Sequence, residues 1–383
     1  MKRFSPIFTM FMMVAVFALV TGCGGGGGSD KTKPASDKTK PASDKTKPAT
    51  DKTKPATDKA AAKKNVTIAY LTNGVDPFWD LAAGGVKRAD QELDHVETLA
   101  GMPPNATVDE QKQYIEAWIA KGVNGIAISP INAANQVDNL NKAAETATII
   151  TQDSDAPDSK RLVFIGVDNY EAGRAAGKLV KKALPDGGKI MIFVGRLGQL
   201  NARQRRQGVI DEVLDRPVQQ LESLEYDEND AKDITVEGSK YIILDTRTDN
   251  FDKGRAKQNA EDAITTVSDL GCMVGLFAYN TPACLLAVKA AGKQGKIKLV
   301  SFDEDADTLE GIVDGHVTGT ISQQPWNYGY KSVMVLDAIL QGDMSVIPDN
   351  KFIKLELKTV VKENVQEFWA QVKEMMDMGK QGG

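Results

Sequence analysis

The sequence predicts an α/β fold made of two doubly wound, parallel-sheet lobes of the Rossmann-like kind. Short apolar runs alternate with amphipathic stretches through residues 65–383. Such alternation indicates parallel strands with helices on both faces of the sheet. The apolar runs number about a dozen, which is more than a usual sheet of ~4–6 strands holds. We therefore expect two lobes.

The first expected strand, residues 66–71, is a continuous apolar run of the kind that forms a buried parallel strand. A helix can begin at Pro77, because the missing N–H of proline would be unpaired at that position. The later strands and helices are predicted by the same two criteria, which are the spacing of the apolar residues and the length of each apolar segment. The expected strands are residues 66–71, 96–99, 124–129, 148–152, 162–167, 189–194, 241–244, 273–278, 297–302 and 317–322. The expected helices are residues 78–93, 108–121, 133–147, 170–184, 201–214, 252–268, 282–291, 309–314 and 327–340.

Two segments depart from this alternation. Residues 217–240 are acidic and irregular, so we expect an insertion or a long loop there. Residues 362–383 form a C-terminal tail with apolar side chains on one helical face, so we expect a helix that packs on a lobe. These side chains are Val365, Phe368, Trp369, Val372 and Met375.

Residues 1–22 read as a secretory leader. Lys2 and Arg3 precede an apolar run, and small residues lead up to Cys23. The run is short for a transmembrane anchor. Its ending resembles the lipobox of bacterial lipoproteins, and this resemblance implies cleavage before Cys23 and acylation of that residue.

Residues 23–64 read as a tether. Five glycines precede a seven-residue repeat of the form Ser-Asp-Lys-Thr-Lys-Pro-Ala. The repeat has no apolar pair for a coiled coil, and its prolines break helices. We expect a disordered, flexible segment with a span of roughly 30 Å. Reach is its expected role, with binding of anionic cell-wall polymers by its lysines as the alternative.

The remainder of the chain is acidic. The whole sequence has a net charge of −5, while the leader contributes two positive charges and the tether eleven lysines against five aspartates. Residues 65–383 therefore carry −13, which argues against nucleic-acid binding. Cys272 is expected just before a strand and Cys284 in the next helix. This separation is too large for a disulfide, so we expect two buried thiols.

Polar side chains follow nearly every expected strand, where small ligands bind in open α/β sheets. Each alone could be a cap or turn residue, but the whole series is hard to explain in that way. Carboxylates and amides bind sugar hydroxyls, and aromatic faces stack on the C–H face of a sugar ring. The series consists of Asp76 with Phe78 and Trp79, Ser129, Gln152, Asp153, Asn201, Arg203, Asp249, Phe251, Tyr279, Asn280, Asp303 and Gln323.

Taken together, these positions resemble the periplasmic sugar-binding proteins of the ribose and glucose/galactose type. Those proteins share the type I periplasmic-binding-protein fold with the ligand domain of LacI-type repressors. The resemblance covers about residues 65–361. Its motifs are Asp-Pro-Phe-Trp at 76–79, Ile-Ile-Thr-Gln-Asp at 149–153, Ile-Gly-Val-Asp-Asn-Tyr-Glu-Ala-Gly at 165–173, Asn-Ala-Arg at 201–203, Tyr-Asn at 279–280, Ser-Phe-Asp at 301–303 and Thr-Ile-Ser-Gln-Gln-Pro at 320–325.

The resemblance implies where each lobe begins and ends. The N-terminal lobe would consist of residues 65–167 plus 325–352, and the C-terminal lobe of residues 168–324 plus 353–361. A three-segment hinge would join them near residues 167–168, 324–325 and 352–354. The tail, 362–383, extends past the usual end of the family.

The resemblance also implies the binding residues. The acceptor of the first loop falls on Asp76, and the aspartate that fixes ring hydroxyls falls on Asp153. The inward arginine of the second lobe falls on Arg203, and its stacking aromatic falls on Phe251, where Asp249 or Asn250 are alternatives. The other expected contacts are Phe78, Trp79, Asn280, Asp303, Gln323, Ser129 and Asn73.

This chain departs from the ribose-type pattern at Ser129 and Ser154, where that pattern has Asn and Arg. Its first loop, with Asp76, is closer to the glucose/galactose type. These departures argue against ribose and favour a pentose or hexose of another kind.

We therefore expect a lipid-anchored solute-binding protein of an ABC importer, which closes its lobes on a monosaccharide. Its expected partners are the sugar, the membrane subunits of an ABC permease, and membrane lipid through Cys23. We expect a monomer on the outer face of the inner membrane or the periplasmic side of the outer membrane. The alternative within this fold is a sugar sensor that feeds a receptor kinase or chemoreceptor.

The sequence offers little support for an enzymatic function. His95 and His316 are the only histidines, and neither fits a triad or a metal cluster. No P-loop or Gly-x-Gly-x-x-Gly follows a strand. The acids from Asp303 resemble a calcium loop, but Thr308 and Asp314 stand where the loop needs Gly and Glu. We expect no catalytic residue, metal or cofactor. The rival from another class is a glycoside-processing enzyme, which needs two carboxylates flanking the scissile bond.

Overall fold

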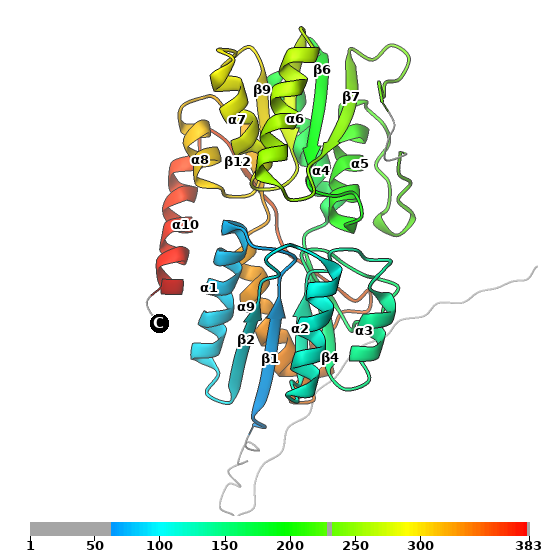
Figure 1. The fold of residues 1–383 in the computed structure, drawn as a ribbon, viewed down its shortest axis with the longest axis vertical. Helices are drawn as coiled ribbons and strands as arrows, with labels where there is room; N and C mark the ends of the chain where they lie inside the picture. The colour runs from blue at the N-terminus through cyan, green and yellow to red at the C-terminus, as the bar shows by residue number, and fades with distance from the viewer. Residues whose placement is uncertain (1–62, 228–231, 381–383) are drawn as a thin grey trace, which may run out of the picture. The chain divides into compact units, whose positions relative to one another are not determined.

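The computed structural model describes residues 63–227 and 232–380. The expected leader, the expected lipidation site Cys23 and the expected tether through residue 62 lie outside the described residues. The described chain forms two lobes, each built around one six-stranded sheet (Figure 1). The prediction of an α/β fold with two parallel-sheet lobes is therefore confirmed. No helix in this part of the chain is long and apolar enough to cross a membrane.

The N-lobe sheet has the strand order β11-β5-β4-β3-β1-β2, and all its pairs are parallel. Its strands are β1 Val66–Leu71, β2 Val96–Gly101, β3 Gly125–Ile128, β4 Thr148–Gln152, β5 Phe164–Gly166 and β11 Phe352–Lys354. Its helices are α1 Pro77–Glu92, α2 Val108–Ala120, α3 Val137–Ala143 and α9 Pro325–Leu340, and a 3-10 turn, η2, covers Met344–Val346. The sheet order switches direction at β1, which opens a crevice at the carboxyl ends of the strands.

The C-lobe sheet repeats this order as β12-β10-β9-β8-β6-β7, with β12 antiparallel to β10. Its strands are β6 Gly188–Val194, β7 Tyr241–Thr248, β8 Leu270–Gly275, β9 Lys298–Phe302, β10 Gly319–Ser322 and β12 Lys358–Val360. Its helices are α4 Asn169–Ala183, α5 Leu200–Val213, α6 Lys253–Thr266, α7 Asn280–Ala290 and α8 Ala306–Val313, with a 3-10 turn, η1, at Leu221–Ser223. Strands β6 to β10 therefore correspond in position to β1 to β5.

The chain crosses between the lobes three times, after β5, after β10 and after β11. At the second crossing Gln324 has φ 58°, and its Nε2 donates to the carbonyl oxygen of Glu356 at the third crossing (2.7 Å). The expected end of the N-lobe at residue 352 is too early. Ile353 and Lys354 pair with β5, and Leu355 N–H donates to Gly166 O at 2.7 Å. The third crossing thus follows Lys354.

One shifted element matters for the site. The strand expected at residues 273–278 is β8, Leu270–Gly275, so Cys272 lies inside the strand rather than before it. Pairing of β8 with β6 ends where Gly275 meets Phe193, and residues 276–279 form a buried loop. Their apolar character reflects this burial and not strand pairing. Both cysteines are buried free thiols.

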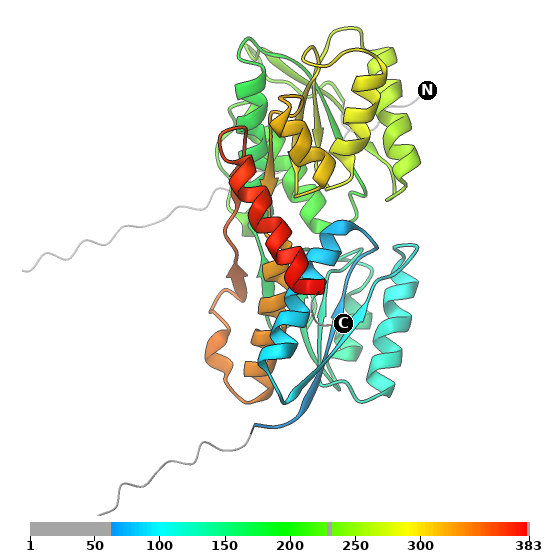
Figure 2. The ribbon, with the colours of Figure 1, turned by 90° about the vertical axis from the view of Figure 1, so that its left-hand side faces the viewer.

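The tail forms helix α10, Val365–Lys380, which contacts both lobes. Figure 2 shows it running beside α1 of the N-lobe, below α8 of the C-lobe. Val365, Phe368 and Val372 are buried in one apolar cluster with Leu81 of α1 and with side chains of the C-lobe. The helical face predicted from the sequence is therefore the buried one, but it bridges the lobes rather than packing on one of them.

Candidate functional site

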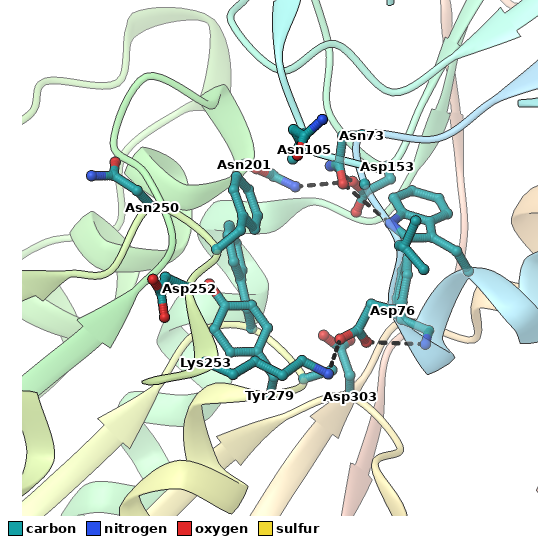
Figure 3. Close-up of a pocket in the computed structure, with 18 of the residues that line it drawn as sticks. Asn73, Asp76, Asn105, Asp153, Asn201, Asn250, Asp252, Lys253, Tyr279 and Asp303 are labelled. Carbon is teal, nitrogen blue, oxygen red and sulfur yellow. Dashed lines mark hydrogen bonds and ion pairs between the residues drawn. The ribbon is translucent and has the colours of Figure 1, made fainter. Parts of the chain in front are cut away.

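A cavity of about 400 Å³ lies between the lobes, at the carboxyl ends of both sheets (Figure 3). Its inner part, called the floor, consists of buried polar side chains: Asn73, Asp153, Asn201, Arg205, Asp303 and Gln323. Its outer part, called the rim, consists of exposed residues: Val75, Pro104, Asn105, Asn250, Asp252 and Lys253. The other lining residues are Gly74, Asp76, Phe78, Trp79, Ala106, Phe251, Phe277, Ala278 and Tyr279.

Asp153 is the floor carboxylate of the N-lobe. Its Oδ2 accepts hydrogen bonds from Ser129 Oγ at 2.8 Å and from Asn201 Nδ2 of the C-lobe at 3.2 Å. Burial raises the pKa of Asp153, while Arg205, Ser129 and Asn201 oppose this rise. Oδ1 lies 3.5 Å from the Arg205 guanidinium. Because a carboxylate oxygen accepts more than one hydrogen bond, Asp153 keeps capacity for a hydroxyl donor.

Arg205 links the floor residues of the C-lobe. It is only 1% exposed, and it donates to Asn169 Oδ1 and to the Leu276 carbonyl, each at 2.9 Å. It also donates to Gln323 Oε1, and Gln323 Nε2 donates to Asp303 Oδ1 at 2.6 Å. Burial raises the pKa of Asp303 well above its usual range, and Arg205 opposes this rise. The floor therefore sets two buried carboxyl groups, one from each lobe, around one guanidinium.

Aromatic rings form walls on both lobes. Phe78 and Trp79, at the start of α1, meet edge to face with ring centroids 4.8 Å apart. Trp79 Nε1 donates to Asn73 Oδ1 at 3.1 Å, which fixes the indole. On the C-lobe, Phe251 and Phe277 are stacked at 5.8 Å and 12°. Aromatic rings thus line the cavity on both sides of a polar floor.

Two bridges join the lobes at the edges of the cavity. Lys253 of α6 lies 3.3 Å from the Asp76 carboxylate, and this ion pair is drawn in Figure 3. Arg196 donates to the Ala106 carbonyl at 2.8 Å and stacks over Phe251 at 5.0 Å. With the Asn201–Asp153 hydrogen bond, these contacts define a closed arrangement of the lobes.

Asp249 supports the C-lobe wall from behind. Its carboxylate accepts from Tyr279 Oη at 2.5 Å and from Asn280 Nδ2 at 2.8 Å. Burial raises the pKa of Asp249 to about 6, against these hydrogen bonds. Asp249 thereby fixes Tyr279, whose ring lines the cavity.

Eight of the residues expected at the site line this cavity: Asn73, Asp76, Phe78, Trp79, Asp153, Phe251, Asp303 and Gln323. Two others lie one step behind the lining. Ser129 holds Asp153, and Asn280 is bonded to Asp249 and to the Phe277 N–H at 3.0 Å.

Arg203 is placed wrongly by the sequence prediction. Its guanidinium stacks over Tyr226 at 4.2 Å, in the segment between α5 and β7, and it does not line the cavity. Residues two apart on an α-helix point about 200° apart around the axis. Since Arg205 points inward, Arg203 faces away, and Arg205 is the arginine of the floor.

Several lining residues are absent from the predicted site. Asn201 and Tyr279 belong to the motifs that resemble the sugar-binding family, so these motifs could have identified them as site residues. Phe277 was hidden because residues 276–278 read as a strand. The rim residues Pro104, Asn105, Asp252 and Lys253 lie on loops after the edge strands or at the start of a helix, and no motif marks them. Across residues 63–227 and 232–380, no group of three or more His, Cys, Asp or Glu side chains could hold a metal ion.

Comparison of this chain with known proteins shows the family to which it belongs. The family model described as "Periplasmic binding protein domain" matches residues 68–344. The ribose import binding protein RbsB of Haemophilus influenzae is 26% identical over 289 residues, covering 74% of this chain and 88% of its own. The fructose import binding protein FruE of Bifidobacterium longum is 27% identical over 274 residues, covering 69% and 75%. A solute-binding protein of an ABC transporter from Burkholderia graminis, solved in complex with D-arabinose, has a TM-score of 0.69 and 26% identity, covering 80% of this chain and 98% of its own. The chain belongs to the periplasmic binding protein family.

Proposed function

We propose that this protein is a lipid-anchored solute-binding protein of an ABC importer, and that its interlobe cavity binds a pentose or hexose ring. The observation that carries the proposal is the floor, where Asp153 and Asp303 come from opposite lobes. Asp153 lies 3.5 Å from Arg205, and Asp303 is linked to Arg205 through Gln323. The import binding proteins RbsB and FruE, to which the chain is similar, support the transport role.

The chemistry of the cavity suits a sugar ring. Carboxylates accept hydrogen bonds from hydroxyl groups, while Asn and Arg side chains donate to hydroxyl oxygens. Trp79 and Phe251 offer ring faces from the two lobes to the apolar C–H faces of the sugar. A polyhydroxylated ring would satisfy both the polar floor and the apolar walls.

Hinge closure would couple binding to transport. The Asn201–Asp153 and Lys253–Asp76 contacts join the lobes, so they exist together only when the lobes are closed. A ligand that touches both lobes binds the closed form better and shifts the population toward it. The closed form would then be recognised by the membrane subunits of the permease.

The anchor would be the acylated Cys23, at the outer face of the inner membrane or the periplasmic side of the outer membrane. Growth of an expressing strain with labelled palmitate tests this part. We expect label on the wild-type chain and none on Cys23→Ala. Equal labelling of the wild type and of Cys23→Ala would contradict the proposed anchor and would leave the proposal of sugar binding unaffected.

A thermal-shift screen of the chain from Cys23 onward tests sugar binding. The ligands are pentoses, hexoses, polyols and inositols, each at millimolar concentration. We expect a rise in Tm with at least one sugar, because a ligand that binds only the folded state stabilises it. No shift with any of them would count against the proposal, and turnover of an aryl glycoside would favour the enzyme alternative.

A further inference from the structure

The cavity keeps more space than one sugar ring needs. Its lobes are already joined at both edges, by Lys253–Asp76 at 3.3 Å and Arg196–Ala106 at 2.8 Å. Between these bridges about 400 Å³ remains. Cavities of roughly 300–1,000 Å³ hold drug-sized ligands, and a single pyranose ring is smaller than these. This volume remains open to solvent at the rim although contacts already join the lobes.

The part of the cavity that a single ring on the floor would leave empty is the part lined by the rim. The floor residues are all 7% exposed or less, so a ring bound there is surrounded by protein. The rim residues line the same cavity and yet are exposed to solvent. A ligand on the floor therefore has an open path outward, between Val75 and Pro104 of the N-lobe and Lys253 of the C-lobe.

Val75 gives this path an apolar contact. It is 61% exposed, and it is one of five exposed large apolar side chains among the described residues. The other four, Val218, Val236, Leu286 and Met344, do not line this cavity. Pro104 and Ala106 belong to the same lining, and Gly74 is close enough to Ala106 that an added Cβ would touch its side chain at 3.4 Å. Val75 and Pro104 therefore make a small apolar face at the mouth.

The loops of the rim also hold unusual backbone conformations. Ala106, Asn250 and Phe251 all have positive φ, at 50°, 57° and 64°. Left-handed residues other than glycine cost free energy and cluster at ligand clamps. A separate hollow of about 310 Å³ is lined by residues that include Arg196 and Asn250. The space beyond the floor is thus bounded by shaped loops of both lobes.

We infer that the ligand is a disaccharide or a glycoside, with one ring on the floor and a second ring at the rim against Val75 and Pro104. This inference rests on the proposed sugar-binding function and deepens it. The floor ring would remain the pentose or hexose held by Asp153 and Asp303. The outer ring would lay an apolar face on Val75 and present hydroxyls to Asn105 and Lys253.

Isothermal titration calorimetry with matched sugars tests this inference. The probes are maltose, cellobiose, lactose, melibiose and xylobiose, each paired with its constituent monosaccharides, together with aryl glycosides of the same sugars. We expect at least one two-ring ligand to bind at least tenfold more tightly than any of its own monosaccharides. A monosaccharide that binds as tightly as its best two-ring derivative would overturn the inference and leave the proposed function standing. Binding of none of the two-ring ligands would overturn the inference, whereas the proposed function fails only if no sugar of the wider thermal-shift screen binds.

Two variants at one exposed position locate the outer ring. Val75→Ser removes the apolar contact and should weaken the two-ring ligand three- to tenfold. Val75→Arg fills the rim and should weaken it more than tenfold. Both should leave the constituent monosaccharide within twofold of wild type, whereas Asp303→Asn, the floor control, should weaken both ligands. Equal effects of Val75→Arg on the two ligands would contradict an outer ring at Val75.

Discussion

Asp153 and Asp303 occupy equivalent positions in the two lobes. Each is the residue directly after the corresponding strand, β4 or β9, and each has a left-handed backbone with φ of 58° and 70°. The N–H of Asp153 donates to the carbonyl of Ile165, and that of Asp303 to the carbonyl of Ile321. In each lobe, the neighbouring strand, β5 or β10, therefore holds the aspartate by the same backbone hydrogen bond. The internal repeat of the fold therefore places one carboxyl group from each lobe on the floor.

Arg205 should matter far more for stability than Arg203. Arg205→Met leaves Asp153 and Asp303 without the one guanidinium between them, and breaking a buried charge network costs about 3–5 kcal/mol. Arg203→Met, the matched control on the same helix, loses only a half-buried stack on Tyr226, worth about 1 kcal/mol. Urea unfolding of both variants measures the difference. Equal losses would mean that Arg205 is not the centre of the network.

The Arg196 bridge should slow the opening of the closed form. Arg196→Ala removes the hydrogen bond to Ala106 and the stack on Phe251, a loss of about 1 kcal/mol. We expect sugar to dissociate three- to tenfold faster, as measured by stopped-flow fluorescence. Lys253→Ala removes an ion pair whose lysine is 62% exposed, so its effect should be smaller and should vanish at high salt. An unchanged dissociation rate in Arg196→Ala would argue against a bridge that closes the lobes.

Asp249 should make stability depend on pH. Burial raises its pKa to about 6 in the folded state, while an unfolded aspartate titrates near ~3.9. The folded state therefore holds the proton more tightly, and this contribution is full below pH ~4 and is lost as pH rises through about 6. Relative to Asp249→Asn, the free energy of unfolding of the wild type should fall by up to about 3 kcal/mol over this range. A difference between the two proteins that stays constant with pH would refute this.

Helix α10 should contribute to the stability of the described chain. Phe368 is 8% exposed and packs in the cluster that contains Leu81 of α1. Phe368→Ala should cost about 3 kcal/mol, near the lower end for buried aromatic truncations. The neighbouring Glu367 is exposed, and Glu367→Ala should stay within about 0.5 kcal/mol of wild type. Thermal unfolding of the two variants compares them directly, and similar Tm values would show that α10 is dispensable.

The sequence located the parts of the site that depend on strand ends. Carboxyl ends of parallel strands gather at one edge, so a polar residue directly after a strand is a reliable marker. Asp153, Asp303 and Gln323 each follow a strand directly and line the cavity for this reason, and Asp76 lines it from the loop between β1 and α1.

The sequence does not predict the site residues whose position depends on the rotation of a helix about its axis or on the course of an irregular loop. Buried residues surround α5 on nearly every side, including Arg205 and Arg206. No apolar stripe therefore indicated which arginine points inward. Phe277 lies in a loop that is as apolar as a strand, and α10 meets α1 only through the tertiary fold.

The most direct test of a sugar ring held between the lobes is calorimetric titration of wild type, Asp153→Asn and Asp303→Asn. The titrant is the sugar that gives the largest thermal shift. Each substitution replaces a carboxyl oxygen that can accept a sugar hydroxyl with an amide NH₂ that cannot, and a buried donor left without its acceptor costs about 1–3 kcal/mol. We predict a loss of affinity of roughly 5- to 150-fold in each variant. Unchanged affinity in both variants would contradict binding between the two carboxyl groups.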